Sequence, residues 1–369
     1  MAGPSLRGGR DAPVGCQNRE VVRRPAAEAD PRTVSWSDPS ATVGAMGEEA
    51  LLSALVSLAG GPDPAVCVAA GDDAAGWTPP AGHTVVVTTD AIVEDVDFRR
   101  RYQLPYAVGW KVYAVSCSDL AAMGASPALV VVTLLLPETT ASGAVLALQR
   151  GIADAARLDG ARVVGGDLSR TAGGVAVSCT AIGTAPAGHL LLRSAGRPGD
   201  RLLVTGEVGG AAAALERLEA GDPVERVAWA ERLLSPRARV AAGRQLARAG
   251  VRCAIDCSDG VLLDTERLAQ ASGCGAELWA DRLPLAGGLA AVWGRERLVR
   301  ALTGGEDFEL IAAAPAALAD PLADGVGWPG DLPPLRVVGQ LRPEPGLTLR
   351  RRRGGPAIPL GPHRGFAHF

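Results

Sequence analysis

A chain of 369 residues exceeds one typical domain, and its 47% hydrophobic and 21% charged residues are the balance of a folded protein. The formal net charge of −3 provides no basic field for a nucleic-acid backbone, so nucleic acid is not an expected partner. No apolar run approaches the ~20 residues of a membrane helix, and the first residues lack a signal peptide's apolar segment, so we expect a cytoplasmic protein without membrane contact.

The N-terminal half is predicted to alternate helices and strands after an unstructured head. Residues 1–42 are rich in Pro, Arg, Gly and Ser without any period, and they are expected to form a disordered extension. The pattern EEALLSALVSLAG from residue 48 predicts an amphipathic helix that ends at the following glycines. Further along, the sequence predicts strands at 66–70, 84–89, 129–136, 162–164 and 174–182, and helices at 111–123 and 143–158.

A stretch of turn residues separates the second half. It covers 184–188 and Arg197-Pro-Gly-Asp200, so we expect an N-terminal domain of residues 43–186 and a C-terminal domain of residues 187–369. Because helices and strands interleave in both halves, the expected fold class is α/β (α+β). The second half is predicted to contain strands at 201–205, 253–256, 308–313 and 335–338, and helices at 210–219, 224–249 (broken at Pro236) and 260–271.

Lys111 is the only lysine of the chain, and every other permanently positive side chain is arginine. The residue before it is Trp110, which excludes the glycine-rich lysine loop of P-loop nucleotide-binding proteins. The set of lysine and H-R-D motifs that defines protein kinases is absent as well. A nucleotide site in this chain must therefore hold phosphates in another way. Whether Lys111 contacts phosphate or supports its helix is left open.

Aspartates recur where predicted strands stop, and strand ends are where α/β proteins place their chemistry. A carboxylate there is a hard oxygen ligand, and Mg²⁺ is usually held by one or two carboxylates together with phosphates and water. Glycine turns beside two of them would let a phosphate approach the backbone. The aspartates concerned are Asp72, Asp73, Asp90, Asp167, Asp256 and Asp259.

Each aspartate also has an ordinary structural explanation. Asp119 and Asp259 precede helical segments and would serve as helix caps, and Asp72 is typical of a turn. Their recurrence favours a metal site over these separate explanations. The segment Asp95-Val-Asp97-Phe-Arg99 is similar to the D-x-D-x-[TV] motif of aspartyl-phosphate phosphatases, but arginine at the fifth position argues against that class.

The chain carries a series of short motifs in a fixed order. They are GDDA at 71–74, TTD at 88–90, GWKVYAVSCSDLAAMGA at 109–125, GGD at 165–167, RS at 193–194, AIDCSDG at 254–260 and GGEDFEL at 304–310. This series resembles that of the thiamine-monophosphate kinases, which belong to the wider superfamily of aminoimidazole-ribonucleotide synthetase-like ATP enzymes. The resemblance extends over residues 43–369.

The resemblance implies a two-domain aminoimidazole-ribonucleotide synthetase-like fold, whose N-terminal sheet pairs with that of a second subunit in a homodimer. It implies that ATP contacts Gly166, Asp167, Arg193 and Ser258. Asp90, Asp256 and Asp259 are expected to be essential for catalysis. Several Mg²⁺ ions would be bound by Asp72, Thr88, Thr89, Asp90, Asp119, Asp167, Asp256 and Asp259.

The substrate pocket is expected around three residues. Glu306 resembles the family's substrate-binding glutamate, and a carboxylate suits a thiazolium cation. Two positions depart from the family pattern: Asp97 stands where a substrate-contacting histidine is common, and His363 stands where a stacking aromatic residue is expected. The substrate pocket is therefore where this chain differs from its family.

The implied reaction transfers the γ-phosphoryl group of ATP to thiamine monophosphate, giving thiamine diphosphate and ADP. Two charged phosphates must meet, so their neutralisation by Mg²⁺ is the main requirement. The acceptor phosphate is already largely dianionic at neutral pH, so no general base is needed. The alternatives are an aminoimidazole-ribonucleotide synthetase-like enzyme and a non-catalytic relative that binds Mg²⁺ and nucleotide.

Overall fold

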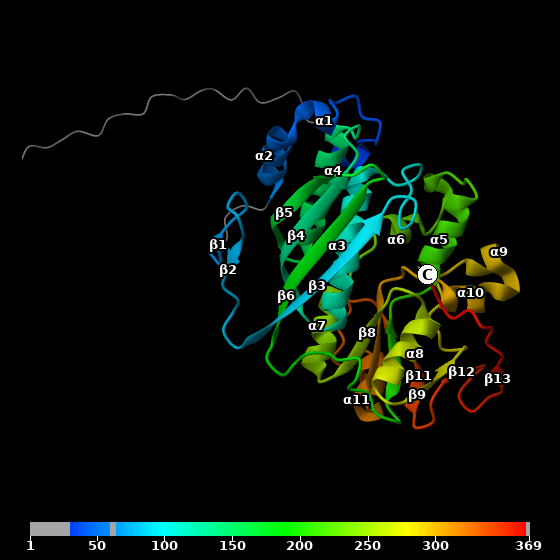
Figure 1. Cartoon of the computed structure of the whole chain (residues 1–369). Helices are drawn as coiled ribbons and strands as arrows, with labels where there is room; N and C mark the ends of the chain where they lie inside the picture. The colour runs from blue at the N-terminus through cyan, green and yellow to red at the C-terminus, as the bar shows by residue number, and fades with distance from the viewer. Residues whose placement is uncertain (1–29, 60–63, 367–369) are drawn as a thin grey trace, which may run out of the picture.

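The computed structural model describes residues 30–59 and 64–366 and places them in two halves, each built on its own sheet (Figure 1). None of the helices in these ranges combines the length and the apolar character that a membrane span requires. The mixture of helices with a four-stranded, a seven-stranded and a small two-stranded sheet confirms the predicted fold class.

The N-terminal half contains a four-stranded sheet in the order β3-β6-β4-β5. The helices α3 (Pro105–Ala122) and α4 (Ser142–Leu158) pack on one face of it. These two helices meet at glycines: a Cβ on Gly109 would lie 1.9 Å from the carbonyl oxygen of Leu148, so only glycine permits this approach. The strands are β3 (His83–Val93), β4 (Ser126–Leu136), β5 (Arg162–Arg170) and β6 (Ala176–Pro186).

The other face of this sheet is exposed and apolar. Val87 on β3 is 61% exposed, and Val85, Val93 and Leu135 are exposed beside it. The burial of β3 alternates along the strand, so its odd-numbered residues point to this face and its even-numbered residues point to the helices. An exposed sheet face with several apolar side chains is a typical interaction surface.

The segment before the sheet is more ordered than expected. Trp36 stacks on Phe98 with ring centroids 6.0 Å apart and donates from its indole nitrogen to the carbonyl oxygen of Gln103. Residues 30–42 of the expected disordered extension 1–42 are thus packed onto the protein, and residues 1–29 lie outside the described ranges. The elements here are η1 (Pro31–Thr33), α1 (Val43–Met46), α2 (Glu48–Leu58), β1 (Val66–Val68) and β2 (Gly76–Trp77).

The C-terminal half contains a seven-stranded sheet in the order β13-β12-β9-β11-β7-β10-β8, in which only β12 and β9 run parallel. Its strands are β7 (Arg201–Thr205), β8 (Cys253–Cys257), β9 (Gly275–Trp279), β10 (Glu309–Ala314), β11 (Leu335–Arg342), β12 (Leu347–Arg350) and β13 (Ala357–Ile358). Its helices are α5 (Gly210–Glu219), η2 (Val224–Arg226), α6 (Ala230–Leu234), α7 (Val240–Ala249), α8 (Val261–Ala271), α9 (Leu289–Trp293), η3 (Gly294–Glu296), α10 (Arg297–Thr303) and α11 (Ala316–Ala323).

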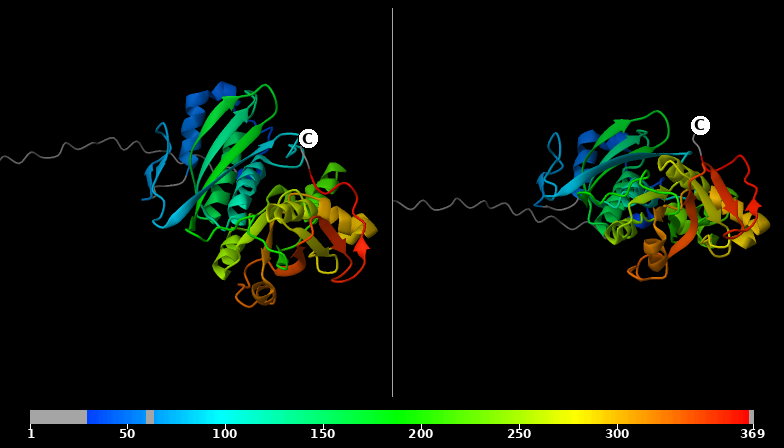
Figure 2. Two further views of the ribbon diagram at one scale, coloured as in Figure 1. Left: turned by 60° about the horizontal axis from the view of Figure 1, so that its bottom comes forward. Right: turned by 90° about the horizontal axis from the view of Figure 1, so that it is seen from below.

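Helix α3 lies between the two sheets (Figures 1 and 2). It covers β3 and β6 of the first sheet and also contacts β8 and β10 of the second. On the C-terminal side it packs against α7, where a Cβ on Gly243 would lie 1.9 Å from the carbonyl oxygen of Ala121. One hydrophobic cluster therefore runs through both halves, from Val132 in the first sheet to Leu310 in the second.

Several element boundaries differ from the predictions. β3 continues through Asp90 to Val93 and β5 continues through Asp167 to Arg170, because the neighbouring strands go on pairing with them. The prediction that these two aspartates end their strands is therefore wrong. The expected long helix 224–249 is divided into η2, α6 and α7, and the sequence pattern did not predict β9, α9, α10, α11, β12 or β13.

Candidate active site

Helix α3 carries polar side chains that reach both halves. Lys111 and Ser118 are seven residues apart and so share one face of the helix, the face toward the C-terminal sheet. Ser116 points the other way and donates to the backbone carbonyl of Cys179 on β6, at 2.8 Å. Asp119 lies ~12 Å along the helix from Lys111, so the polar face spans about two helical turns.

Three carboxylates interact at the C-terminal end of α3. Asp119 accepts a hydrogen bond from the Thr88 hydroxyl at 2.6 Å, and Asp256 on β8 accepts one from the Ser118 hydroxyl at 2.8 Å. Burial, followed by the negative charge of Asp119, raises the pKa of Asp90 to about 6. The same two causes raise the pKa of Asp256 to about 7. Asp119 therefore couples a carboxylate of each sheet.

This acidic group, Asp90, Asp119 and Asp256, fits a divalent cation. The Oδ2 atom of Asp90 is buried and has no hydrogen-bond partner in the described part of the chain. A cation would satisfy that oxygen and offset the mutual repulsion of the carboxylates. Within residues 30–59 and 64–366, however, no group of three or more Asp, Glu, His or Cys side chains is placed to hold a metal ion. Mg²⁺ commonly completes its shell with water and substrate phosphates, so a partial protein site is sufficient.

A groove of about 420 Å³ opens beside the acidic group. Thr88, Asp119 and Arg193 line it together with apolar residues such as Leu120 and Met123. The side chain of Arg193 is exposed, and its charge partly opposes the raised pKa of Asp256. The groove thus places a guanidinium opposite carboxylates, a pairing suited to a phosphate bridged by a metal ion.

Two predicted metal ligands lie on the other side of the sheet. Thr89 points to the open face, where its hydroxyl lies 2.9 Å from that of Thr180. Asp167 on β5 also belongs to that face, in register with Thr133. β3 and β5 are separated by β6 and β4, about 14 Å across the sheet. One ion cannot bridge Asp90 and Asp167 within a single chain.

Gly166 has a structural reason to be glycine. It pairs with Val132 in the β4–β5 ladder, and a Cβ at this position would lie 1.9 Å from the carbonyl oxygen of Val132. The close approach of β4 and β5 therefore requires glycine at this position. The contact of Gly166 with ATP remains a prediction.

The remaining predicted metal ligands have other partners. Asp259 forms an ion pair with Arg267, and its backbone nitrogen donates to Asp264 at 2.9 Å. Asp72 is exposed in the β1–β2 connection and accepts from the backbone nitrogen of Asp73 at 2.8 Å. The predicted eight-residue metal group is thus divided over several places in the single chain.

Two of the three predicted substrate residues, Asp97 and Glu306, contact Lys111. Its ammonium group lies 2.6 Å from Oε1 of Glu306 and donates to the backbone carbonyl of Asp97 at 2.9 Å. The Asp97 carboxylate is used locally, because it accepts from the backbone nitrogen of Val93 at 2.8 Å. The backbone nitrogen of Glu306 donates to the carbonyl of Ser258 at 2.7 Å. Lys111 therefore contacts protein groups from both halves.

His363 is exposed on the C-terminal segment. Three residues later, the backbone nitrogen of Phe366 donates to the carbonyl of Asp259 at 3.0 Å, so this segment returns to the end of β8. Within the described residues, no hydrogen bond or ion pair joins His363 to Glu306.

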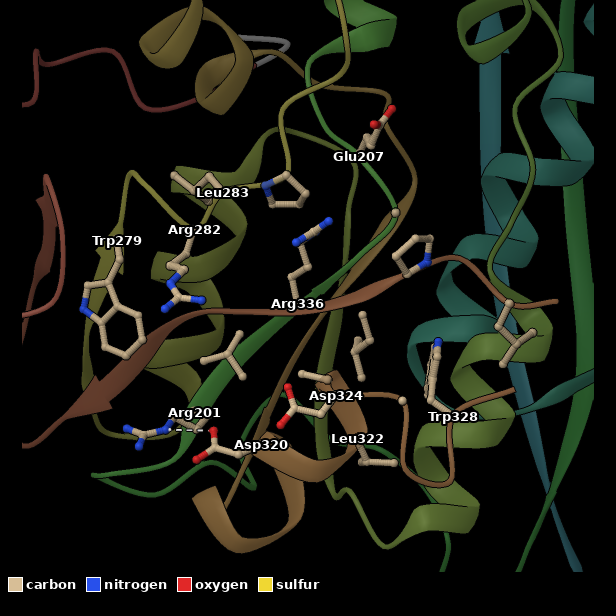
Figure 3. Close-up of a pocket in the computed structure, with 18 of the residues that line it drawn as sticks. Arg201, Glu207, Trp279, Arg282, Leu283, Asp320, Leu322, Asp324, Trp328 and Arg336 are labelled. Atoms are coloured by element: carbon tan, nitrogen blue, oxygen red, sulfur yellow. Dashed lines mark hydrogen bonds and ion pairs between the residues drawn. The ribbon is translucent and has the colours of Figure 1, made fainter. Parts of the chain in front are cut away.

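A larger hollow lies elsewhere (Figure 3). It measures about 1510 Å³ and lies around α11 and the adjacent ends of β7, β9 and β11. It contains none of the predicted site residues, and charges of both signs line it, including the ion pair of Arg201 with Asp320. We place the chemistry at the smaller groove, because the acidic group of Asp90, Asp119 and Asp256 lies beside that one.

Sequence reasoning missed Ser116 and Ser118. Both precede Asp119 on α3. Because neighbouring residues of a helix point in different directions, the side chains of Ser116, Ser118 and Asp119 lie on different faces of α3. The sequence SCSD contained that signal.

Comparisons with known proteins agree with this architecture. The family model "AIR synthase related protein, N-terminal domain" matches residues 71–185, and "AIR synthase related protein, C-terminal domain" matches residues 197–350. A thiamine-monophosphate kinase of Synechococcus elongatus is 33% identical over 314 residues, which are 81% of this chain and 91% of that protein. The Escherichia coli K12 thiamine-monophosphate kinase is 32% identical over 305 residues, with the same two coverages.

Solved structures give the same result. The thiamine-monophosphate kinase of Stenotrophomonas maltophilia K279a aligns with a TM-score of 0.72 at 32% identity, over 82% of this chain and 95% of that one. AaThiL complexed with AMPPCP and TMP aligns with a TM-score of 0.68 at 28% identity, over 79% and 89%. The hydrogenase maturation protein HypE of E. coli shares the fold, with a TM-score of 0.64 at 18% identity over 84% and 95%.

Proposed function

Because the chain belongs to the thiamine-monophosphate kinase family, we propose that it transfers the γ-phosphoryl group of ATP to thiamine monophosphate, giving thiamine diphosphate and ADP. The observation that carries this proposal is the match to a thiamine-monophosphate kinase over 91% of that protein's length. The acidic group beside the groove supports it, because phosphoryl transfer depends on positioning and charge neutralisation.

Mg²⁺ is the proposed metal, and Asp90, Asp119 and Asp256 would hold it. When bound there, it would neutralise the charge of phosphate oxygens. Arg193 would bind a phosphate at the groove, and the buried carboxylates would stay fixed by the hydroxyls of Thr88 and Ser118. No residue needs to remove a proton from the acceptor, since a phosphate monoester is already largely dianionic at neutral pH.

A homodimer through the open face of the N-terminal sheet is also part of the proposal. Val87 and its exposed apolar neighbours on β3 and β4 would be buried against a second copy. Thr89 and Asp167 point to that face, so they would lie at the subunit interface rather than in the acidic group of their own chain. Glu306 would contact thiamine monophosphate, with Ser258 and His363 nearby.

The test is to incubate the purified chain with Mg-ATP and thiamine monophosphate and to measure thiamine diphosphate. Product formation supports the proposal. No product from a chain that still binds ATP would contradict it and favour a non-catalytic nucleotide-binding relative.

Asp90→Asn and Asp256→Asn test the metal assignment in the same assay. Each removes a charge from the acidic group, so kcat should fall by about 100-fold or more. Asp331→Asn, at an exposed turn outside all predicted site residues, is the matched control and should keep its rate. Rates near wild type in both site variants would overturn the assignment.

A further inference from the structure

We propose that Lys111 is a positioning residue, which fixes Glu306 and the loop around Asp97 in the geometry that thiamine monophosphate requires. This inference rests on the proposed function and adds a residue that the family motifs alone do not explain. Lys111 does not itself touch the substrate, because its ammonium group is enclosed by protein.

The contacts of Lys111 tie the two halves together at the substrate site. Its side chain is 1% exposed although it carries a charge, and such a charge needs partners. One partner is the carbonyl oxygen of Asp97, in the N-terminal half, and the other is Oε1 of Glu306, in the C-terminal half. Both loops are therefore held by one buried cation on the rigid helix between them.

The loop that carries Glu306 is strained in a way that calls for such support. Glu306 has φ +68° and Phe308 has φ +48°, which side chains other than glycine rarely adopt. Backbone bonds to β8 hold both residues: Glu306 donates to Ser258 at 2.7 Å, and Phe308 donates to Cys257 at 2.9 Å. In addition to these backbone hydrogen bonds, the ion pair with Lys111 fixes the side chain of Glu306. Strain of this kind is maintained at functional sites.

The chemistry of the position explains why lysine stands there. Every other permanently positive side chain of the chain is arginine, so this is the one place where arginine was not used. An ammonium group is compact and can direct its N–H groups to a carbonyl and a carboxylate at an angle, whereas a guanidinium is a larger, planar fork. In a site this enclosed, the guanidinium would displace either the Asp97 loop or Glu306.

Loss of the ammonium has two opposing effects on a cationic substrate. Glu306 would lose its fixed position, which weakens binding. A positive charge near the thiazolium ring would also disappear, which strengthens binding. Because the Glu306 side chain is 29% exposed, water screens the second effect, and the loss of position dominates.

The experiment measures steady-state kinetics, and calorimetric binding of thiamine monophosphate, for Lys111→Met and Lys111→Arg. We expect KM and Kd for thiamine monophosphate to rise about 10-fold or more in both variants, with KM for ATP nearly unchanged. If the site required only a positive charge, Lys111→Arg would bind thiamine monophosphate as wild type does. Weak binding by Lys111→Arg therefore distinguishes the positioning role from a requirement for charge alone. Unchanged or tighter binding of thiamine monophosphate in Lys111→Met would overturn the proposal.

A double-mutant cycle shows whether Lys111 acts through Glu306. In a Glu306→Gln background, Lys111→Met should add little to the loss of binding. Full additivity of the two losses would overturn the proposal.

Arg239→Met is the matched control for general destabilisation. It removes the cation from buried Glu309, which Arg239 contacts at 2.6 and 2.8 Å only three residues after Glu306. Its midpoint of thermal unfolding should fall at least as far as that of Lys111→Met, while Kd for thiamine monophosphate changes less. An equal loss of binding in the control would overturn the specific role of Lys111.

A wild-type chain that binds thiamine monophosphate without forming product would contradict the proposed function alone. A wild-type chain that does not bind thiamine monophosphate would overturn both the proposed function and the role of Lys111.

Discussion

The buried carboxylate of Asp256 lowers the stability of the folded protein when it is ionised. It is buried beside Asp119, and these two causes raise its pKa to about 7. The unfolded chain releases this proton near the ordinary aspartate value of 3.8, whereas the folded chain keeps it to about 7. Between those values the folded state binds more protons, so its stability falls as the pH rises through that window.

Asp256→Asn should therefore stabilise the metal-free protein at pH 8. The amide keeps an acceptor for Ser118 and removes the charge, and the expected gain is of the order of a few kcal/mol. Thermal unfolding with a chelator, at pH 4.5 and pH 8, measures it: the advantage should be small at the lower pH and larger at the higher one. Asp331→Asn, at an exposed turn, is the control. A mutant less stable than wild type at pH 8 would contradict this account.

At the scale of elements, close backbone contacts determine where the site residues lie. β4 and β5 approach so closely at Gly166 that a Cβ there would meet the carbonyl of Val132. At neighbouring Gly165 a Cβ would have no atom within 4 Å. A side chain is therefore excluded at Gly166 and has room at Gly165, although the two residues are adjacent in the sequence.

Gly166→Ala should destabilise the protein by about 2 kcal/mol or more, because the strands must separate or bend. Gly165→Ala should change the free energy of unfolding by less than about 1 kcal/mol. Urea unfolding of the two variants side by side makes the comparison, and equal stabilities would show that the ladder tolerates a side chain at residue 166.

The elements also explain what could be predicted from the sequence. Long apolar or periodic stretches such as α4 and β4 were predicted nearly as they occur, because local pattern determines them. Asp90 was predicted to be a metal ligand at the end of a strand. The strand continues past it because β3 goes on pairing with β6, and the sequence of β3 alone does not show that pairing. Asp259 was predicted to be a metal ligand from its motif, whereas its ion pair with Arg267, eight residues later, is visible only in the fold.

At the scale of the whole molecule, the open face of the N-terminal sheet determines the expected assembly. Val87 is 61% exposed at its centre. Val87→Asp should convert the proposed dimer to a folded monomer, because a charge there would be buried at the interface. Light scattering after gel filtration gives the mass. Leu158→Asp is the control: Leu158 is 63% exposed at the end of α4, away from this face, and its variant should stay dimeric. A monomeric wild type would contradict the proposal.

The position of α3 has a consequence for how ligands enter and leave. A helix in backbone contact with α4 on one side and α7 on the other cannot serve as a hinge, since either half would have to break its glycine contacts in order to rotate. Ligand access should therefore depend on short segments around the site, such as residues 359–366, which are hydrogen-bonded to Asp259 through Phe366, rather than on separation of the two halves. Turnover limited by product release would then respond to substitutions in that terminal segment more than to changes in the 187–200 connection.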